Sequence, residues 1–243
     1  MLTALISTFL LLNLSALLSR SLIASDLVIG AAADLAPAEA SLTHAFRKIS
    51  GASAVFASGS SGNLARQIQN GAPYDVFLSA NDSFVDELVK SGYLVADSVR
   101  VYAYGRVALW SRGGKVRSLQ DLLAPGVLHV AIANPLHAPY GVAAQQILKN
   151  QGLWDRLAAK IVYGENVQQA LQFAESGNAD AAITAWSLVF DHGGILLPAK
   201  WHAPVRQAGA VVKSSRQRAL AGRFLEFLTG AEGKALLRKY GFN

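Results

Sequence analysis

Residues 55–80 read Val-Phe-Ala-Ser-Gly-Ser-Ser-Gly-Asn-Leu-Ala-Arg-Gln-Ile-Gln-Asn-Gly-Ala-Pro-Tyr-Asp-Val-Phe-Leu-Ser-Ala. The β-rich runs Val55–Ala57 and Val76–Ser79 enclose a segment with helical character that begins near Leu64. A strand, a short loop with glycine, a helix and a second strand form the repeating unit of α/β folds with parallel strands. This stretch therefore predicts an α/β fold.

The same alternation extends in both directions along the chain. Further candidate strands are Leu27–Ala31, Val107–Trp110, His129–Ile132, Ile161–Tyr163 and Ala181–Thr184. Apolar residues at helical spacing (i, i+3, i+4, i+7) occur at Val167, Ala170, Leu171 and Ala174, and a similar face follows at Leu220, Phe224, Phe227 and Leu228. We expect mixed, mainly parallel sheets that are flanked by helices.

The length of the chain favours two lobes. It has 243 residues and a mass of 25.7 kDa, which exceeds the usual size of one domain. No Pro/Gly/Ser-rich linker divides it, and the extended stretches Ala103–Val107 and Val205–Val212 are the candidate crossings. Two crossings predict a discontinuous lobe I (residues 26–104 and 208–243), an inserted lobe II (residues 105–207) and a ligand cleft between them.

Composition excludes several classes of protein. Hydrophobic residues make up 52% and charged residues 16%, which excludes an intrinsically disordered chain. The absence of cysteine removes disulfides, cysteine nucleophiles and thiolate metal sites. The net charge is +6, but the basic residues are scattered and no run is longer than Arg238-Lys239. This distribution indicates a solvated surface rather than a nucleic-acid partner.

The first 25 residues differ from the rest. The leucine-rich run Leu5–Leu18 ends at Ser19-Arg20, and it is too short for a transmembrane helix of about 20 apolar residues. It is typical of the apolar core of a secretory signal, with a cleavage zone at Ala24-Ser25. We predict that residues 1–25 are a cleaved signal peptide and that the mature protein is periplasmic. No Lys or Arg precedes the run, so a retained membrane anchor or a misassigned start codon is the alternative.

Four segments share one design, in which a strand ends, a short polar or glycine-bearing loop follows and a helix begins. They are Ala31–Leu35, Ser60–Leu64, His137–Gly141 and Gly164–Val167. The first turn of a helix has unpaired N–H groups and the positive end of the helix dipole. Several helix starts in one cleft would hold an anion without a cationic side chain. By itself, Ser60–Leu64 is better explained as an ordinary helix cap, Glu165-Asn166 is likewise an ordinary cap, and Pro139 is explained by a turn.

Taken together, in this order and at these spacings, the segments resemble the periplasmic molybdate-binding proteins of ABC importers. The resemblance runs from about Val28 to Phe242. Its marks are Ala31–Leu35, Ser60–Ile68, Asn70–Ala80, Asn134–Gly141, Gly164–Leu171 and Tyr240–Phe242.

The resemblance implies a two-lobed, type II periplasmic binding protein with molybdate or tungstate in the cleft. Carried over by position, the donors are the hydroxyl and N–H of Ser61, the N–H groups of Tyr140 and Val167, and the first loop at Ala33 and Asp34. These groups hold the oxygens of the oxyanion, and no residue is a direct metal-ion ligand. The resemblance also implies a monomer that is not an enzyme, needs no cofactor and delivers its ligand to a membrane permease.

Two positions depart from the family pattern. Asp34 stands where many members have serine, and a carboxylate about 4 Å from a dianion costs roughly 4 kcal/mol per unit charge. Either Asp34 turns away and caps its own helix, or the ligand carries a proton, as phosphate does; we interpret Asp34 as a cap. Ala185 stands where some members have a ligand-binding tyrosine, and the phenol of Tyr140 is the candidate replacement.

Two other functions stay open at this point. In an enzyme, Ser61 would be a nucleophile with His137 as base and Asp34 or Asp75 as the orienting group, but Ser61 lacks the Gly-x-Ser-x-Gly elbow. A binder of phosphate, sulfate or thiosulfate would differ only in the ligand. The five histidines show no i, i+4 pair or other metal-ligand spacing, so we expect His137 to be structural.

Overall fold

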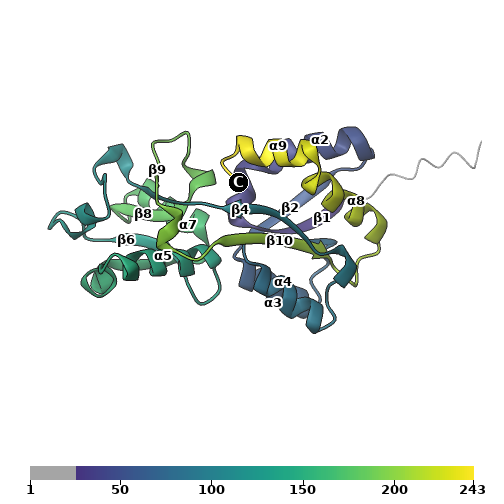
Figure 1. The fold of residues 1–243 in the computed structure, drawn as a ribbon, viewed down its shortest axis with the longest axis horizontal. Helices are drawn as coiled ribbons and strands as arrows, with labels where there is room; N and C mark the ends of the chain where they lie inside the picture. Colours follow the sequence, from purple (N-terminus) through teal and green to yellow (C-terminus); the bar gives the residue numbers. More distant parts are fainter. Residues whose placement is uncertain (1–25) are drawn as a thin grey trace, which may run out of the picture.

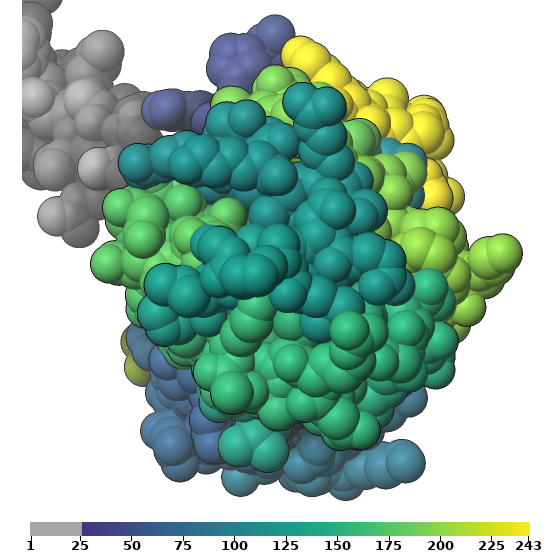
Figure 2. Space-filling view, turned by 90° about the vertical axis from the view of Figure 1, so that its left-hand side faces the viewer, coloured from purple at the N-terminus to yellow at the C-terminus, as the bar shows by residue number. Residues whose placement is uncertain are grey.

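The computed structural model describes residues 26–243, and the predicted signal peptide at residues 1–25 lies outside them. Within the described residues, the chain forms two lobes, each built on one five-stranded sheet (Figure 1). Figure 2 looks at the molecule from the lobe II end, and lobe II, in teal and green, covers most of lobe I in that direction. The predicted two-lobed α/β fold is confirmed.

Lobe I has the strand order β2-β1-β3-β10-β4. Helices α2, α8 and α9 lie on one side of the sheet, and α3 and α4 lie on the other (Figure 1). Its strands and helices are β1 (Leu27–Ala32), η1 (Ala33–Ala38), α2 (Glu39–Ser50), β2 (Ala54–Gly59), α3 (Ser61–Gln69), β3 (Val76–Ser79), α4 (Asp82–Lys90), η2 (Ala96–Ser98), β4 (Arg100–Gly105), β10 (Val205–Val211), α8 (Arg218–Thr229) and α9 (Ala231–Lys239).

Lobe II has the strand order β7-β6-β8-β5-β9. Helix α5 packs with the core of this lobe, and α7 packs its alanines against β6 and β8. Its strands and helices are β5 (Val107–Trp110), η3 (Arg112–Gly114), η4 (Gln120–Leu123), β6 (Val130–Ala133), α5 (Pro139–Asn150), α6 (Trp154–Leu157), η5 (Ala158–Lys160), β7 (Ile161–Gly164), α7 (Val167–Ser176), β8 (Ala181–Ala185), η6 (Trp186–Leu188), β9 (Ile195–Leu196) and η7 (Ala199–Trp201).

Both sheets are mixed, as predicted. β1 pairs in parallel with β2 and β3, and β6 pairs in parallel with β7 and β8. The other strands run antiparallel: β10 beside β3 and β4, and β5 beside β8 and β9. The inner strands β1, β3, β6 and β8 are almost wholly buried, because helices cover both faces, and this explains their apolar sequences.

Two neighbouring strands connect the lobes. The chain leaves lobe I at the end of β4 and enters β5 after Arg106, and it returns through β10. β10 pairs with β4 from Val205 opposite Gly105 onward, so the two crossings lie side by side (Figure 1). The predicted boundary between residues 207 and 208 falls within β10, and the division into lobes at these residues stays a prediction.

Each lobe has its own hydrophobic core. In lobe I, Phe46 and Phe224 meet edge to face with ring centroids 5.1 Å apart. The lobe II core continues across the cleft, because Ala32, Ala33 and Ala80 of lobe I belong to the same cluster of buried residues. Each large apolar side chain that is fully buried contributes about 1.5–3 kcal/mol. The small alanines at the cleft let the backbones of the two lobes approach closely.

Candidate functional site

A small cavity lies between the lobes where several helices begin. Its volume is about 10 Å³, close to the least that holds one water molecule, so the lobes are nearly in contact around it. The predicted residues Ala33, Asp34, Ser61, Tyr140 and Val167 all line this cavity, together with Ala32, Gly59, Ser60, Ala80, Ala138, Pro139 and Asn166. The structure therefore brings the five together, and their role as ligand donors stays a prediction.

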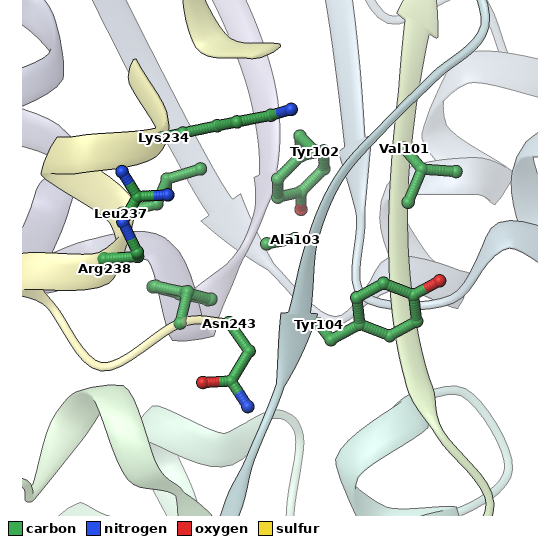
Figure 3. Close-up of a pocket in the computed structure, with 9 residues that line it drawn as sticks. Val101, Tyr102, Ala103, Tyr104, Lys234, Leu237, Arg238 and Asn243 are labelled. Carbon is green, nitrogen blue, oxygen red and sulfur yellow. The ribbon is translucent and has the colours of Figure 1, made fainter. Parts of the chain in front are cut away.

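Larger cavities occur elsewhere, and none of the five predicted residues lines them. One of about 270 Å³ lies between β4 and α9, where Tyr102 lies on the side of Lys234 and Arg238, whereas the ring of Tyr104 points away from them (Figure 3). Another of about 700 Å³ lies in lobe II beside Arg112 and other polar residues. We consider the small cavity to be the candidate site, because donors from both lobes converge there.

Two of the helix starts at the cavity have an N–H group without a partner. Ser61 is the first residue of α3, and the N–H of Gly62 donates to the carbonyl of His137 at 2.9 Å. Tyr140 is the second residue of α5, and the N–H of Gly141 donates back to the carbonyl preceding the helix at 2.9 Å. Within residues 26–243, neither the Ser61 nor the Tyr140 N–H donates to a protein acceptor. Both are available to an anion.

The third helix start belongs to α7. The side chain of Asn166 caps this helix, and its oxygen accepts from the N–H groups of Gln168 and Gln169 at 3.0 Å each. The carbonyl of Val167 accepts from the hydroxyl of Thr184 at 2.9 Å, which fixes the first turn on β8. The N–H of Val167 has no acceptor among the described residues. Asn166 is therefore a cap, and its capping leaves this donor for the cavity.

The hydroxyl of Ser61 is oriented by the next strand. Its oxygen accepts a hydrogen bond of 3.0 Å from the N–H of Ala80, immediately after β3, and the side chain is 1% exposed. Because the hydroxyl oxygen already accepts one bond, its own proton is left to donate. Ser61 thus offers two donors, a hydroxyl and a backbone N–H, at one point of the cavity.

Asp34 does not cap its helix, and that prediction is wrong. Asp34 is the second residue of η1, whose cap position is Ala32, and no side chain caps this helix. Oδ2 of Asp34 instead accepts from the hydroxyl of Tyr140 at 2.8 Å and from Nε2 of Gln207. The hydroxyl of Ser187 donates to the Asp34 carbonyl at 2.7 Å. The side chain therefore reaches toward lobe II and the crossing strand rather than along its own helix.

Burial dominates the electrostatics of Asp34. Removal from water raises the pKa of its carboxyl to about 6, although the hydrogen bonds from Gln207, Tyr140 and its own N–H lower it in part. Burial, followed by the nearby Asp34 charge, also raises the pKa of Tyr140 and of Tyr102 well above the usual value. The Tyr140 phenol donates a hydrogen bond to the Asp34 carboxylate. In this structure it therefore does not replace, toward a ligand, the hydroxyl that is missing at Ala185.

Contacts at the edge of the cavity hold the lobes together. Nδ1 of His137 lies 2.9 Å from the hydroxyl of Ser60, and the amide of Asn63 donates to Glu165 at 3.0 Å. A Cβ on Gly62 would lie 2.9 Å from both Cβ and the carbonyl oxygen of His137, so only glycine permits this approach. Partial burial, followed by Arg66, lowers the pKa of His137, against a smaller opposite effect of Glu165.

The serine-hydrolase alternative requires a triad that the structure does not assemble. His137 bonds Ser60 rather than Ser61. The carboxylate of Asp34 is bonded to Tyr140 and Gln207, and Asp75 accepts from the hydroxyl of Ser215 at 2.6 Å on another part of lobe I. The described part of the chain also has no group of three or more Asp, Glu, His or Cys side chains placed to hold a metal ion.

Sequence reasoning missed Gln207, Ser187 and Gly105. Gln207 is a fully buried polar side chain on β10, and a lone amide within the apolar end of that strand was the available signal. A Cβ on Gly105 would lie 2.2 Å from the hydroxyl oxygen of Tyr140 and 2.8 Å from Nε2 of Gln207. The glycine at the crossing therefore makes room for the polar cluster.

Comparison with known proteins places the chain in a family. The sequence profile described as "Bacterial extracellular solute-binding protein" matches residues 27–243. The chain belongs to this solute-binding family. Within it, the "Molybdate-binding protein ModA" of Rhodobacter capsulatus is 34% identical, and the match covers 90% of this chain and 88% of the relative.

Solved structures agree with this assignment. The periplasmic molybdate-binding protein of Azotobacter vinelandii superposes on this solute-binding protein with a TM-score of 0.85 at 33% identity, covering 89% of this chain and 98% of the other. The sulfate-binding protein SubI of Mycobacterium tuberculosis shares the fold, with a TM-score of 0.75 at 18% identity and coverage of 90% and 86%. The resemblance to molybdate-binding proteins, predicted from the loop motifs, is confirmed.

Proposed function

We propose that this solute-binding protein captures molybdate or tungstate in the cavity between its lobes and delivers it to the membrane permease of an ABC importer. One observation carries the proposal. The N–H groups of Ser61, Tyr140 and Val167 have no acceptor in the described chain, and the Ser61 hydroxyl accepts from Ala80 and keeps its proton to donate. All three residues line one cavity. Four donors from two lobes match the oxygens of a tetrahedral oxyanion.

The helix starts at the cavity favour an anion that is held reversibly, whereas Asp34, which also lines it, opposes an anion when ionised. None of its lining residues, all within the described chain, is a lysine, arginine or histidine. The positive ends of α3, α5 and α7 supply the field instead. Neutral donors permit release, because no buried ion pair has to be broken when the lobes separate.

The two-lobed architecture supports a transport role without chemistry. Lobes joined by two adjacent strands can close on a ligand about a hinge, and the oxyanion is then cargo rather than a cofactor. We propose that the protein works as a monomer without catalytic activity and that the closed form docks on a separate permease chain. Within residues 26–243, no helix is long and apolar enough to cross a membrane. We further propose that residues 1–25 direct export to the periplasm.

The choice of molybdate or tungstate rests on the relatives. Both the Rhodobacter and the Azotobacter proteins carry molybdate in their names and are at least 33% identical to this chain. The likeness to the sulfate-binding protein is confined to the fold, because the identity is 18%. Phosphate, sulfate and thiosulfate are the competing ligands that the binding experiment has to compare with molybdate and tungstate at the same site.

Calorimetric titration tests the proposal. The purified protein, expressed as the full chain, is titrated in turn with molybdate, tungstate, sulfate and phosphate. We expect saturable 1:1 binding of molybdate and tungstate and at least hundredfold weaker binding of sulfate. Binding of only sulfate or phosphate would replace the ligand, and silence with all four, joined by hydrolysis of small activated esters, would replace the function with the enzyme alternative.

A further inference from the structure

One oxygen of the Asp34 carboxyl is left without a partner. Both side chains that donate to the group, Tyr140 with its hydroxyl and Gln207 with its amide, bond Oδ2. Oδ1 is buried and, among the residues described, has no hydrogen-bond partner, while the side chain as a whole is 0% exposed. A buried carboxylate oxygen without a hydrogen-bond donor costs free energy unless a ligand supplies the missing hydrogen bond. Asp34 lines the same cavity as Ser61 and Val167.

No lysine, arginine or histidine is among the described groups that shift the pKa of this carboxyl. The titratable groups that act on or face it are Tyr140 on α5 and Tyr102 on β4, and both stay neutral because their pKa values are raised. Of the elements packed against η1, α2 carries Glu39, which accepts from Ser58, and the exposed side chains His44, Arg47 and Lys48. Helix α7 carries Glu175 at its far end, and β1, β2 and η6 have no titratable side chain. Arg106 stacks over the Trp186 ring of η6, with its guanidinium 5.6 Å from the ring centroid. An oxyanion would thus approach Asp34 without a compensating cation.

We propose that Asp34 and the bound oxyanion share one proton, held between Oδ1 and the nearest ligand oxygen. The inference rests on the proposed function, since it concerns the same cavity. For molybdate, tungstate or sulfate, the dianion and the ionised carboxylate enter the complex with one proton taken from solvent. Hydrogen phosphate brings that proton itself. The site therefore recognises an oxyanion together with a proton, and Oδ1 is the acceptor that requires it.

The shared proton predicts a pH dependence with a definite sign. Without ligand, burial raises the pKa of Asp34 to about 6, so the carboxyl is ionised at pH 8 and carries a proton below pH 6. Capture of a dianion at pH 8 then takes up one proton, and affinity falls about tenfold per pH unit as the pH rises above 7. Below pH 6 the proton is already in place, and affinity becomes independent of pH.

The experiment is proton counting by calorimetry. The purified protein is titrated with molybdate at pH 8 in two buffers with different ionisation enthalpies, and the slope of observed enthalpy against ionisation enthalpy gives the protons taken up. We expect about one proton for the wild-type protein and none for Asp34→Asn, whose affinity stays constant from pH 6.5 to 8.5. Asp121→Asn, at a partly exposed carboxylate in lobe II that accepts from the N–H groups of Arg117 and Ser118, serves as the matched control and should retain the uptake of one proton.

The outcomes separate this inference from the proposed function. Tight molybdate binding by the wild-type protein without proton uptake would overturn the shared proton and leave oxyanion capture standing. Uptake that persists in Asp34→Asn would also overturn it, because another group would then hold the proton. Absence of oxyanion binding in the wild-type protein would overturn both. The wild-type measurement is decisive even if the Asn variant does not fold.

Discussion

The hydroxyl of Tyr140, on lobe II, donates a hydrogen bond of 2.8 Å to Oδ2 of Asp34, on lobe I. Gln207, on the returning strand β10, contacts both groups, and its Nε2 lies 3.2 Å from the Tyr140 oxygen. The space for this contact exists because Gly105, where the chain first crosses, has no Cβ. One buried polar cluster thus joins both lobes and both crossings, and it adjoins the candidate ligand cavity.

Asp34 makes the stability of the protein depend on pH. Its folded pKa of about 6 lies above the ordinary value of 3.8, so the stabilising contribution is fully present below pH 3.8 and is lost as the pH rises through 6. We expect the unfolding free energy of the wild type, relative to Asp34→Asn, to decrease by about 2 to 3 kcal/mol between pH 4 and pH 8. Urea denaturation without oxyanion measures it, and a constant difference across this range would contradict the assignment.

Ser61 is predicted to bind the ligand directly through its hydroxyl. Ser61→Ala should weaken molybdate binding by about 1–3 kcal/mol, because a hydrogen bond to a charged partner is lost. Ser58→Ala, which removes an exposed hydroxyl that donates to Glu39, should leave the affinity unchanged. Calorimetric dissociation constants for the two variants decide the matter, and equal affinities would remove the Ser61 hydroxyl from the site.

Gly62 controls how closely the lobes approach. In Gly62→Ala the new methyl would lie 2.9 Å from His137, so the lobes should stay apart and molybdate affinity should fall at least tenfold. Gly222→Ala on α8 adds a methyl where nothing lies within 4 Å; it should raise the unfolding free energy by about 0.5–1 kcal/mol and leave binding unchanged. Small-angle scattering with and without molybdate reports closure. A Gly62→Ala protein that compacts like the wild type would refute this role.

Export is predicted to remove residues 1–25. Intact-mass spectrometry of the protein from the periplasm of an expressing bacterium should give a chain that begins at Asp26, after the small pair Ala24-Ser25. Mass of the full 243-residue chain in the membrane fraction would favour the retained anchor instead.

Much of the fold follows from local sequence patterns. The predicted strands Val76–Ser79 and Val107–Trp110 agree with β3 and β5 residue for residue, because buried central strands are short, apolar and bounded by turns. β4 and β9 had no such pattern: β4 mixes exposed and buried residues without regular alternation, and β9 has two residues. Their pairing depends on contacts with β10 and β5, which are distant in sequence.

In the site, too, local sequence patterns predict some residues but not the contacts between residues that are distant in sequence. Ser61 and Val167 are found from sequence because loop motifs at helix starts carry their own signal, and both line the cavity. Asp34 was misinterpreted because its bonds go to residues 106 and 173 positions away, and a local rule for acidic residues near a helix start predicts a cap instead. Tertiary packing decides whether the Asp34 carboxylate caps its own helix or accepts hydrogen bonds from Tyr140 and Gln207.

Locating the bound oxyanion tests the central claim most directly. Crystals grown with tungstate permit the heavy atom to be found by its anomalous scattering. We predict one strong peak between the lobes, with oxygens of the ion within hydrogen-bonding distance of the N–H groups of Ser61, Tyr140 and Val167 and of the Ser61 hydroxyl. A peak at another place, such as the cavity beside Lys234 and Arg238, or an empty cleft at saturating tungstate, would contradict the account.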